Sequence, residues 1–485
     1  MEFFSMLSDF LNGILNSVNG FLYSTVLLVL LLVSGVYFSV RTRLVQFRMM
    51  GEGIRLLSES NDNEKAVSGF QALMVSCASR LGVGNIAGVA SAVILGGPGA
   101  IFWMWVTAAL GGASAFVEST LAQVYKERTE EGGFRGGPSF YLVKIFKHRW
   151  VGVLFSISLI CSFAYGFQVL QANMVTQSLE QHLGSSPMVS VGTGIFMAAV
   201  TAWAVFGGQK IVAKISEVLV PFMAVAFLLL SLVVIFMNAG NIPYVFSQIF
   251  TMAFDFESIS GGFAGTAISI GLRRGLYSNE AGMGSAPNAA ATVECSHPAK
   301  QGLVQMLAVF IDTIVLCTAT ALLILSPQVP YTTDMKDLAL VQAAAESQFG
   351  EFGIWFISIS VFFFAFGTII GNYYYTESNV YYILNRQTSL KFFRLSIVVA
   401  VFIGCIMSTT LAWNLADLTM GIMVLLNVPA LFILSNKSIR VLKDYEAQKK
   451  AGKDPVFYAE NVGITDCECW KKEQAAPIPK DSVAK

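Results

Sequence analysis

Charged residues are scarce in this chain of 485 residues. Asp, Glu, Lys and Arg make up 13% of it, whereas 55% of the residues are hydrophobic, and the formal net charge is zero. A balanced charge indicates neither a nucleic-acid partner nor an acidic one, so any information lies in where the charges fall. We expect no nucleic-acid partner.

Histidine and cysteine are also few. The three histidines, His148, His182 and His297, lie in predicted loops without metal-ligand spacing, which disfavours a membrane enzyme. The seven cysteines form an odd set that gives no disulfide framework. The N-terminus lacks the basic region and the cleavage site of a signal peptide. Residues 1–19 instead carry apolar residues at helical spacing beside polar ones, which predicts an amphipathic helix at the membrane interface.

Long apolar segments are what the chain has in abundance. Each is long enough to cross a bilayer, so they predict an all-α integral membrane protein with eleven transmembrane helices. The segments cover residues 20–40, 67–95, 98–125, 150–179, 188–206, 212–237, 244–271, 300–325, 352–376, 395–411 and 414–435.

The positive charges fall in alternate loops. Of the 31 Lys and Arg residues, all but Arg80 and Lys336 lie in the loops that follow odd-numbered segments, in the first residues after those loops, or in the tail after the last segment. Cytoplasmic loops carry the excess of positive residues. The N-terminus is therefore expected outside the membrane and the C-terminus in the cytoplasm.

The second and seventh segments are long and have glycine-rich centres. When the first segment is set aside, the other ten form two groups of five with opposite orientation, over residues 67–237 and 244–435, and each group begins with a glycine-rich member. Inverted repeats with unwound helices at matching positions are typical of secondary transporters with a mid-membrane site. Residues 20–66 then form an extra transmembrane helix and a cytoplasmic loop, and residues 436–485 a flexible cytoplasmic tail.

The first glycine-rich centre reads LGVGN, from Leu81 to Asn85. If the helix unwinds there, the N–H groups of Val83 and Gly84 are free to bind a carboxylate. The carbonyl groups from Ala78 to Leu81 could coordinate a small hard cation such as Na⁺, with the Asn85 side-chain oxygen nearby. The alternative is that small residues merely let helices pack closely.

Arg80 lies in the same segment, where a charge is costly. Glu118 and Asp312 are candidate partners. A structural ion pair and a contact with the substrate are equally open.

The second glycine-rich centre reads SGGFAGT, over residues 260–266. Its aromatic ring could close over a small side chain, and freed backbone groups could meet an ammonium group. The alternative is a packing seam without a ligand. The candidate residues are Gly262, Phe263, Gly265 and Thr266.

Isolated polar side chains occur in two other segments. Gln171 and Asn173 place amides at membrane depth, where the partner is either a substrate or another helix. Thr368 is a lone hydroxyl among aromatic residues, and such a threonine usually bonds its own helix.

A stretch rich in small residues, Arg273–Ala291, follows the seventh segment. It predicts tight packing against neighbouring helices or part of an inner gate, and these interpretations are compatible. The residues assigned to the gate are Ser278, Asn279, Glu280 and Gly282.

Five stretches between about residues 66 and 430 carry a family resemblance. They are RGLYSNEAGMGSAPNAAA (Arg274–Ala291), GNIAGVASAVILGGPGAIFWMWVTAALG (Gly84–Gly111), FRGGPSFY (Phe134–Tyr141), QGLVQMLAVFIDT (Gln301–Thr313) and FFAFGTIIGNYYYTE (Phe363–Glu377). Through them the chain resembles the alanine or glycine:cation symporters, sodium-coupled amino-acid carriers of bacteria and archaea with the leucine-transporter fold. The resemblance implies a multi-pass protein of the plasma (inner) membrane.

The resemblance also implies a site. The substrate carboxylate would lie on Val83 and Gly84 with Asn85 close by, Gln171 would be a substrate ligand, and residues 261–266 would face the rest of the amino acid. Sodium would be held by the carbonyl groups of Ala78 and Leu81 with the hydroxyl group of Thr368.

We therefore expect a sodium-driven symporter for a small neutral amino acid, alanine or glycine, that works by alternating access without covalent catalysis. Position 83 is valine where the resemblance favours threonine, which leaves glutamine or another neutral amino acid open as substrate. Proton coupling is a second alternative, and a channel is a third from a different class. The expected partners are the amino acid, Na⁺ as coupling ion and membrane lipid, with no organic cofactor and no obligate protein partner.

Overall fold

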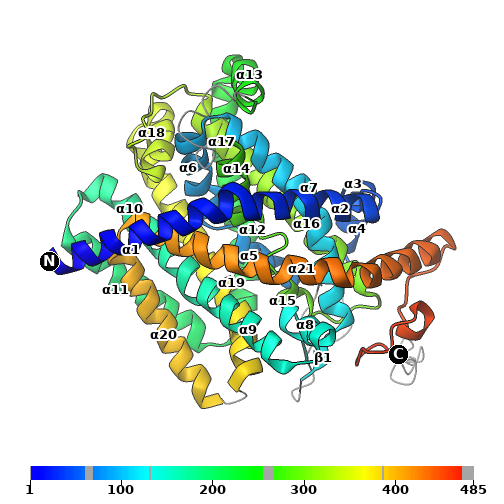
Figure 1. The fold of residues 1–485 in the computed structure, drawn as a ribbon. Helices are drawn as coiled ribbons and strands as arrows, with labels where there is room; N and C mark the ends of the chain where they lie inside the picture. Colours follow the sequence, from blue (N-terminus) through cyan, green and yellow to red (C-terminus); the bar gives the residue numbers. More distant parts are fainter. Residues whose placement is uncertain (1, 60–68, 130–132, 255–266, 385–386, 472–485) are drawn as a thin grey trace, which may run out of the picture.

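The computed structural model of the chain describes residues 2–59, 69–129, 133–254, 267–384 and 387–471, and these residues are almost entirely helical (Figure 1). The α-helices are α1 (Glu2–Phe21), α2 (Leu27–Arg41), α3 (Val45–Arg48), α4 (Met50–Leu56), α5 (Gly69–Arg80), α6 (Ala87–Gly96), α7 (Gly99–Val124), α8 (Pro138–Phe146), α9 (Arg149–Leu159), α10 (Phe167–Leu183), α11 (Pro187–Phe206), α12 (Gln209–Met237), α13 (Ile242–Met252), α14 (Ala267–Asn279), α15 (Pro287–Ala290), α16 (Pro298–Val309), α17 (Thr318–Leu325), α18 (Asp337–Phe349), α19 (Glu351–Leu384), α20 (Gln387–Ile406) and α21 (Thr409–Lys450).

Short segments of other types join these helices. The π-helical turns are Leu22–Val26, Ile160–Gly166 and Phe310–Cys317, and the 3₁₀ turns are Val83–Asn85, Ala239–Asn241 and Ala459–Val462. Strands β1 (Glu127–Arg128) and β2 (Phe134–Arg135) pair antiparallel.

Nine helices within the described ranges are long and apolar enough to cross a membrane. They correspond to nine of the eleven predicted segments. The two others, 67–95 and 244–271, are the glycine-rich ones, and neither is one continuous helix. The all-α prediction is confirmed, whereas the count of eleven is not reproduced.

The N-terminal helix differs from its prediction. Instead of a separate interfacial helix over residues 1–19, α1 continues through the π-helical turn into α2, so that Phe10–Arg41 is one helix. This helix lies along α21 (Figure 1), where Asn19 donates a hydrogen bond to the Asn414 carbonyl (3.0 Å). No residue between α1 and α2 breaks the helical path, because the π-helical turn keeps its backbone helical.

The first glycine-rich segment is interrupted as predicted. Helix α5 ends at Arg80, Gly82 is extended (φ −115°, ψ −160°), and α6 begins at Ala87. The extended glycine removes the helical hydrogen-bonding pattern, which leaves main-chain groups free at the centre of the molecule.

A second interruption of the helical path follows α14, where we did not predict one. The expected centre at residues 260–266 lies outside the described residues. Helix α14 continues past the predicted end of its segment, residue 271, to Asn279, and the chain is then non-helical until α15. Gly282 (φ +84°) and Gly284 (φ +82°) adopt the left-handed conformation that favours glycine, so the helix cannot continue through them. Part of the stretch that we predicted as a loop is thus helical, and the rest is a buried break between two helices.

The C-terminal region is ordered where we predicted a flexible tail. Helix α21 extends to Lys450, and the following residues to 471 fold back against the same end of the molecule as α8 and α15 (Figure 1). Phe457, Ile464 and Trp470 are buried there, which explains why this polar segment docks.

Candidate functional site

The main chain between α5 and α6 has broken its helical hydrogen bonds. The Gly82 N–H donates to the Arg80 carbonyl (2.8 Å) and not to Ala78, four residues back. The Ala78 carbonyl instead accepts a hydrogen bond from the hydroxyl group of Thr368 on α19 (3.0 Å). The structure therefore brings together two residues that we predicted as sodium ligands.

Gln171 on α10 meets the other side of this interruption. Its Oε1 accepts a hydrogen bond from the Val83 N–H (3.1 Å), and its Nε2 donates to the hydroxyl group of Tyr277 on α14 (3.0 Å). A neutral amide oxygen thus lies at a freed N–H group at the start of a half-helix, a position that favours a carboxylate.

The glycines at this point allow very close approach. A Cβ atom at Gly82 would lie 2.3 Å from Oγ1 of Thr368 and 3.0 Å from Nε2 of Gln171. A Cβ atom at Gly84 would lie 2.6 Å from Cδ1 of Tyr277. Only glycine fits at both positions, so the space around the interruption is narrow.

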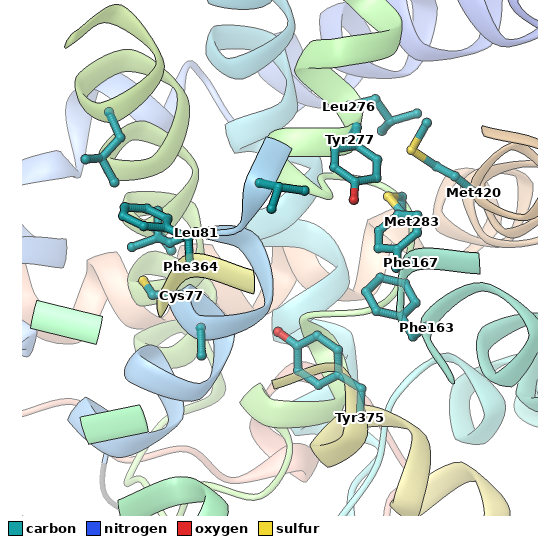
Figure 2. Close-up of a cluster of buried hydrophobic side chains, with 14 of the residues drawn as sticks. Cys77, Leu81, Phe163, Phe167, Leu276, Tyr277, Met283, Phe364, Tyr375 and Met420 are labelled. Carbon is teal, nitrogen blue, oxygen red and sulfur yellow. The ribbon is translucent and has the colours of Figure 1, made fainter. Parts of the chain in front are cut away.

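An aromatic wall faces the interruption. Ring centroids follow one another from Trp413 to Tyr277 (5.2 Å), Phe167 (4.6 Å), Phe163 (4.7 Å) and Tyr375 (5.8 Å). Figure 2 shows the hydroxyl groups of Tyr277 and Tyr375 directed toward the same region, beside the end of α5 at Leu81. The wall supplies an apolar face with two polar groups.

Asn85 connects the first interruption to the π-helical turn that contains Asp312. Its Nδ2 donates to Oδ1 of Asp312 (2.6 Å), while its own Oδ1 is buried without a hydrogen-bond partner among the described residues. The same carboxyl group accepts hydrogen bonds from Ser278 and from Thr313 (2.9 Å). Asn85 and Ser278, which we predicted separately, thus meet at one carboxylate.

The second interruption is held by two other carboxyl groups. Glu118 on α7 accepts the N–H groups of Gly282 (3.2 Å) and Gly284 (3.1 Å). Glu280 accepts hydroxyl groups from Ser79 (2.8 Å) and Ser285 (2.6 Å). Since Ser79 belongs to α5, this contact joins the two interruptions directly.

An ionic layer covers Tyr277 on the α18 side of the site. Arg274 pairs with Asp417 (2.9 Å) and lies over the ring of Trp413, whose Nε1 donates to Asp337 (2.9 Å). Burial raises the pKa of Asp337 to about 6, although the Trp413 hydrogen bond and the positive charge of Arg274 oppose the shift. This layer closes the site on that side.

Not every predicted residue belongs to this arrangement. Asn173 donates to the Gly404 (3.2 Å) and Met407 (2.6 Å) carbonyl groups, so its amide joins α10 to α20. Arg80 forms no ion pair within 4.0 Å with Glu118 or Asp312 in the described part of the chain. The candidates of the second glycine-rich centre, Gly262, Phe263, Gly265 and Thr266, lie outside the described residues.

Sequence reasoning missed Tyr277 and the contact of Asp312 with Asn85. Tyr277 stands inside the stretch RGLYSNEAG, and the prediction that this stretch is cytoplasmic hid it. Asp312 is a carboxyl group within an apolar segment, and that signal alone marks a functional candidate.

No group of three or more His, Cys, Asp or Glu suited to a metal ion occurs among the residues that the structure describes. The carbonyl and hydroxyl oxygens at Ala78 and Thr368 are instead the kind of ligands that a hard cation such as Na⁺ prefers.

Comparison with protein families gives one match across most of the chain. Residues 8–459 match the model of the sodium:alanine symporter family. The chain is 44% identical over 468 residues to the probable sodium/glutamine symporter GlnT of Bacillus subtilis (strain 168), covering 96% of this chain and 97% of that protein. It is 42% identical over 469 residues to the amino-acid carrier protein AlsT of the same organism, covering 96% and 99%.

The fold also matches solved transporters. The crystal structure of MhsT in complex with L-phenylalanine superposes with a TM-score of 0.56 at 12% identity, covering 83% of this chain and 94% of that one. At this identity the likeness shows the fold alone, which is the leucine-transporter fold.

Proposed function

Because the chain belongs to the sodium:alanine symporter family, whose members are multi-pass membrane transporters and not enzymes, we propose that it imports a small neutral amino acid, alanine or glycine, by sodium symport. The two solutes would share one site at the helix interruptions. Alternating access would then expose this site to each side of the membrane in turn.

The freed Val83 N–H group carries this proposal. It is bonded to a neutral side chain, Gln171, and not to a backbone carbonyl. A substrate carboxylate could replace the Gln171 oxygen there and form a stronger, charge-assisted hydrogen bond. Val83, Gly84, Asn85 and Gln171 are therefore the substrate residues we propose.

The cation would bind beside the carboxylate. The Ala78 carbonyl is freed from its helix and already meets the Thr368 hydroxyl group. The Asn85 N–H donates to the carbonyl of Gly82. In a continuous α-helix it would donate to the carbonyl of Leu81 instead, so the Leu81 carbonyl does not receive this hydrogen bond. Oxygen atoms of Ala78, Leu81 and Thr368 form the sodium site we propose.

The narrow space supports a small substrate. A Cβ atom added at Gly82 or Gly84 would touch the side chain of Thr368, Gln171 or Tyr277. Glutamine is the alternative, favoured by the name of the relative GlnT. A larger substrate would require Tyr277 to move away from Gly84.

We propose an N-terminus outside, a C-terminus in the cytoplasm of a bacterial or archaeal cell, and a core of two inverted repeats over residues 67–237 and 244–435. The distribution of Lys and Arg supports this orientation. Gly262, Phe263, Gly265 and Thr266 stay proposed substrate contacts, and Ser278, Asn279, Glu280 and Gly282 a proposed gate.

Uptake into proteoliposomes tests the function. We expect labelled alanine or glycine to accumulate under an inward Na⁺ gradient, and excess unlabelled substrate to compete. Preference for glutamine would change the substrate but keep symport, and accumulation driven only by a proton gradient would change the ion. Symport would be contradicted by uptake that depends on neither the Na⁺ nor the proton gradient. It would also be contradicted by a current at fixed voltage that does not saturate with substrate concentration.

A further inference from the structure

Three carboxyl groups and one guanidinium group are buried together around the two helix interruptions. Arg80, Glu118, Glu280 and Asp312 are each at most 2% exposed. The other buried carboxyl groups on the described membrane-spanning helices have an arginine close by, at 2.9 Å for Asp417 with Arg274 and 2.8 Å for Glu377 with Arg394. Among the described residues, the central carboxyl groups differ in that no arginine pairs with them.

Arg80 directly follows Ser79, whose hydroxyl group donates to Glu280 (2.8 Å), but Arg80 itself pairs with no carboxyl group among the described residues. Its only hydrogen bond among the described residues runs from Nη1 to the Gln305 carbonyl (3.3 Å). Its Nε and Nη2 are buried without a partner in that part of the chain.

The carboxyl groups are held by neutral donors instead. Glu118 accepts two backbone N–H groups, Glu280 accepts two serine hydroxyl groups, and Asp312 accepts the Asn85 amide. Neutral donors carry no net charge, so when these carboxyl groups are ionised only a nearby cation offsets them. Arg80 is not one of these donors, and its Nε and Nη2 have no partner among the described residues.

We propose that Arg80 is the internal counter-charge of the unloaded carrier. Resting on the proposed symport, this inference states that Na⁺ offsets the buried carboxylates in the loaded carrier. After Na⁺ and substrate leave, the guanidinium group moves onto these carboxylates and balances them while the site returns across the membrane. Net transport requires this return without ligands, whereas exchange of one substrate molecule for another does not.

A comparison of net uptake with exchange therefore tests whether Arg80 acts in the return of the unloaded carrier. In Arg80→Gln we expect net Na⁺-driven uptake to fall by at least about tenfold. Exchange of internal unlabelled for external labelled alanine, with equal Na⁺ on both sides, should stay within about twofold of wild type. Retained exchange also shows that the variant folds and binds.

Two further variants keep the test decisive. Arg80→Lys keeps the charge and should restore net uptake, also if Arg80→Gln does not fold. Arg394→Gln removes an arginine that, unlike Arg80, is paired with a carboxyl group, Glu377 (2.8 Å), and should change uptake and exchange alike. Equal loss of both activities in Arg80→Gln and Arg80→Lys, or unchanged net uptake in Arg80→Gln, would overturn the inference while leaving symport intact. A wild type that shows neither activity would overturn the proposed function and this inference together.

Discussion

Gln171 holds the first interruption against α14 with the two ends of one amide. If a substrate carboxylate takes over the Val83 N–H, loss of this amide should affect substrate binding directly. We expect Gln171→Ala to raise the KM for substrate by about tenfold. This factor corresponds to the free energy of one hydrogen bond to a charged group. The sodium dependence should change little.

Asn173 is the matched control for this measurement. It is a buried amide on the same helix, but its bonds run to carbonyl groups near the end of α20. Asn173→Ala should lower thermal stability and leave KM close to wild type. If both variants raise KM equally, the effect belongs to helix packing and not to substrate recognition.

Thr368 offers the corresponding test for the cation. The hydroxyl oxygen of Thr368 lies beside the Ala78 carbonyl oxygen, and removing it takes one oxygen ligand from the proposed Na⁺ site. In Thr368→Ala the Na⁺ concentration for half-maximal uptake should rise by about tenfold, with substrate KM at saturating Na⁺ little changed. Thr368→Ser keeps the oxygen and should behave like wild type. A shift in substrate KM alone would remove Thr368 from the sodium site.

At the scale of elements, the 3₁₀ turn before α6 meets α14 through a glycine and an aromatic ring. A methyl group at Gly84 would lie 2.6 Å from the Tyr277 ring, so Gly84→Ala must push α14 away from the interruption. We expect uptake to be abolished in that variant. In Gly88→Ala, at the start of α6, the added methyl group has its nearest neighbour, Trp413, at 3.8 Å, so this variant should transport normally. Normal uptake by Gly84→Ala would show that this contact opens during transport.

Sequence patterns predicted the elements better than their connections. Apolar length identified nine spanning helices, and the glycines of LGVGN located the first interruption, because both signals are local. The interruption after α14 was not predicted, because a glycine-rich stretch reads as a loop in the sequence and the backbone angles of Gly282 and Gly284 are not visible there. The predicted centre at 260–266 lies outside the described residues. Contacts such as Asn85 with Asp312 join residues 227 positions apart, and periodicity carries no information about them.

At the scale of the whole molecule, the C-terminal segment fastens the loop after α15 to α21 and α7. The Phe457 N–H donates to the Ser296 carbonyl (2.9 Å), and Nε1 of Trp470 donates to the Gln123 carbonyl (2.7 Å). Lys437 on α21 pairs with Asp466 (2.8 Å). Because α15 follows the second interruption, any movement of α15 must either carry the C-terminal segment along or break its contacts with the loop after α15.

Trp470 is the residue through which this docking can be measured. It is 8% exposed and packs on Phe457, with ring centroids 5.4 Å apart. Trp470→Ala should therefore cost about 3 kcal/mol of stability and lower the Tm of the purified protein by several degrees. Val456→Ala in the same segment, 41% exposed, should change the Tm by much less. An unchanged Tm in Trp470→Ala would mean that the segment leaves the end of α7 in solution, and that the loop after α15 moves without it.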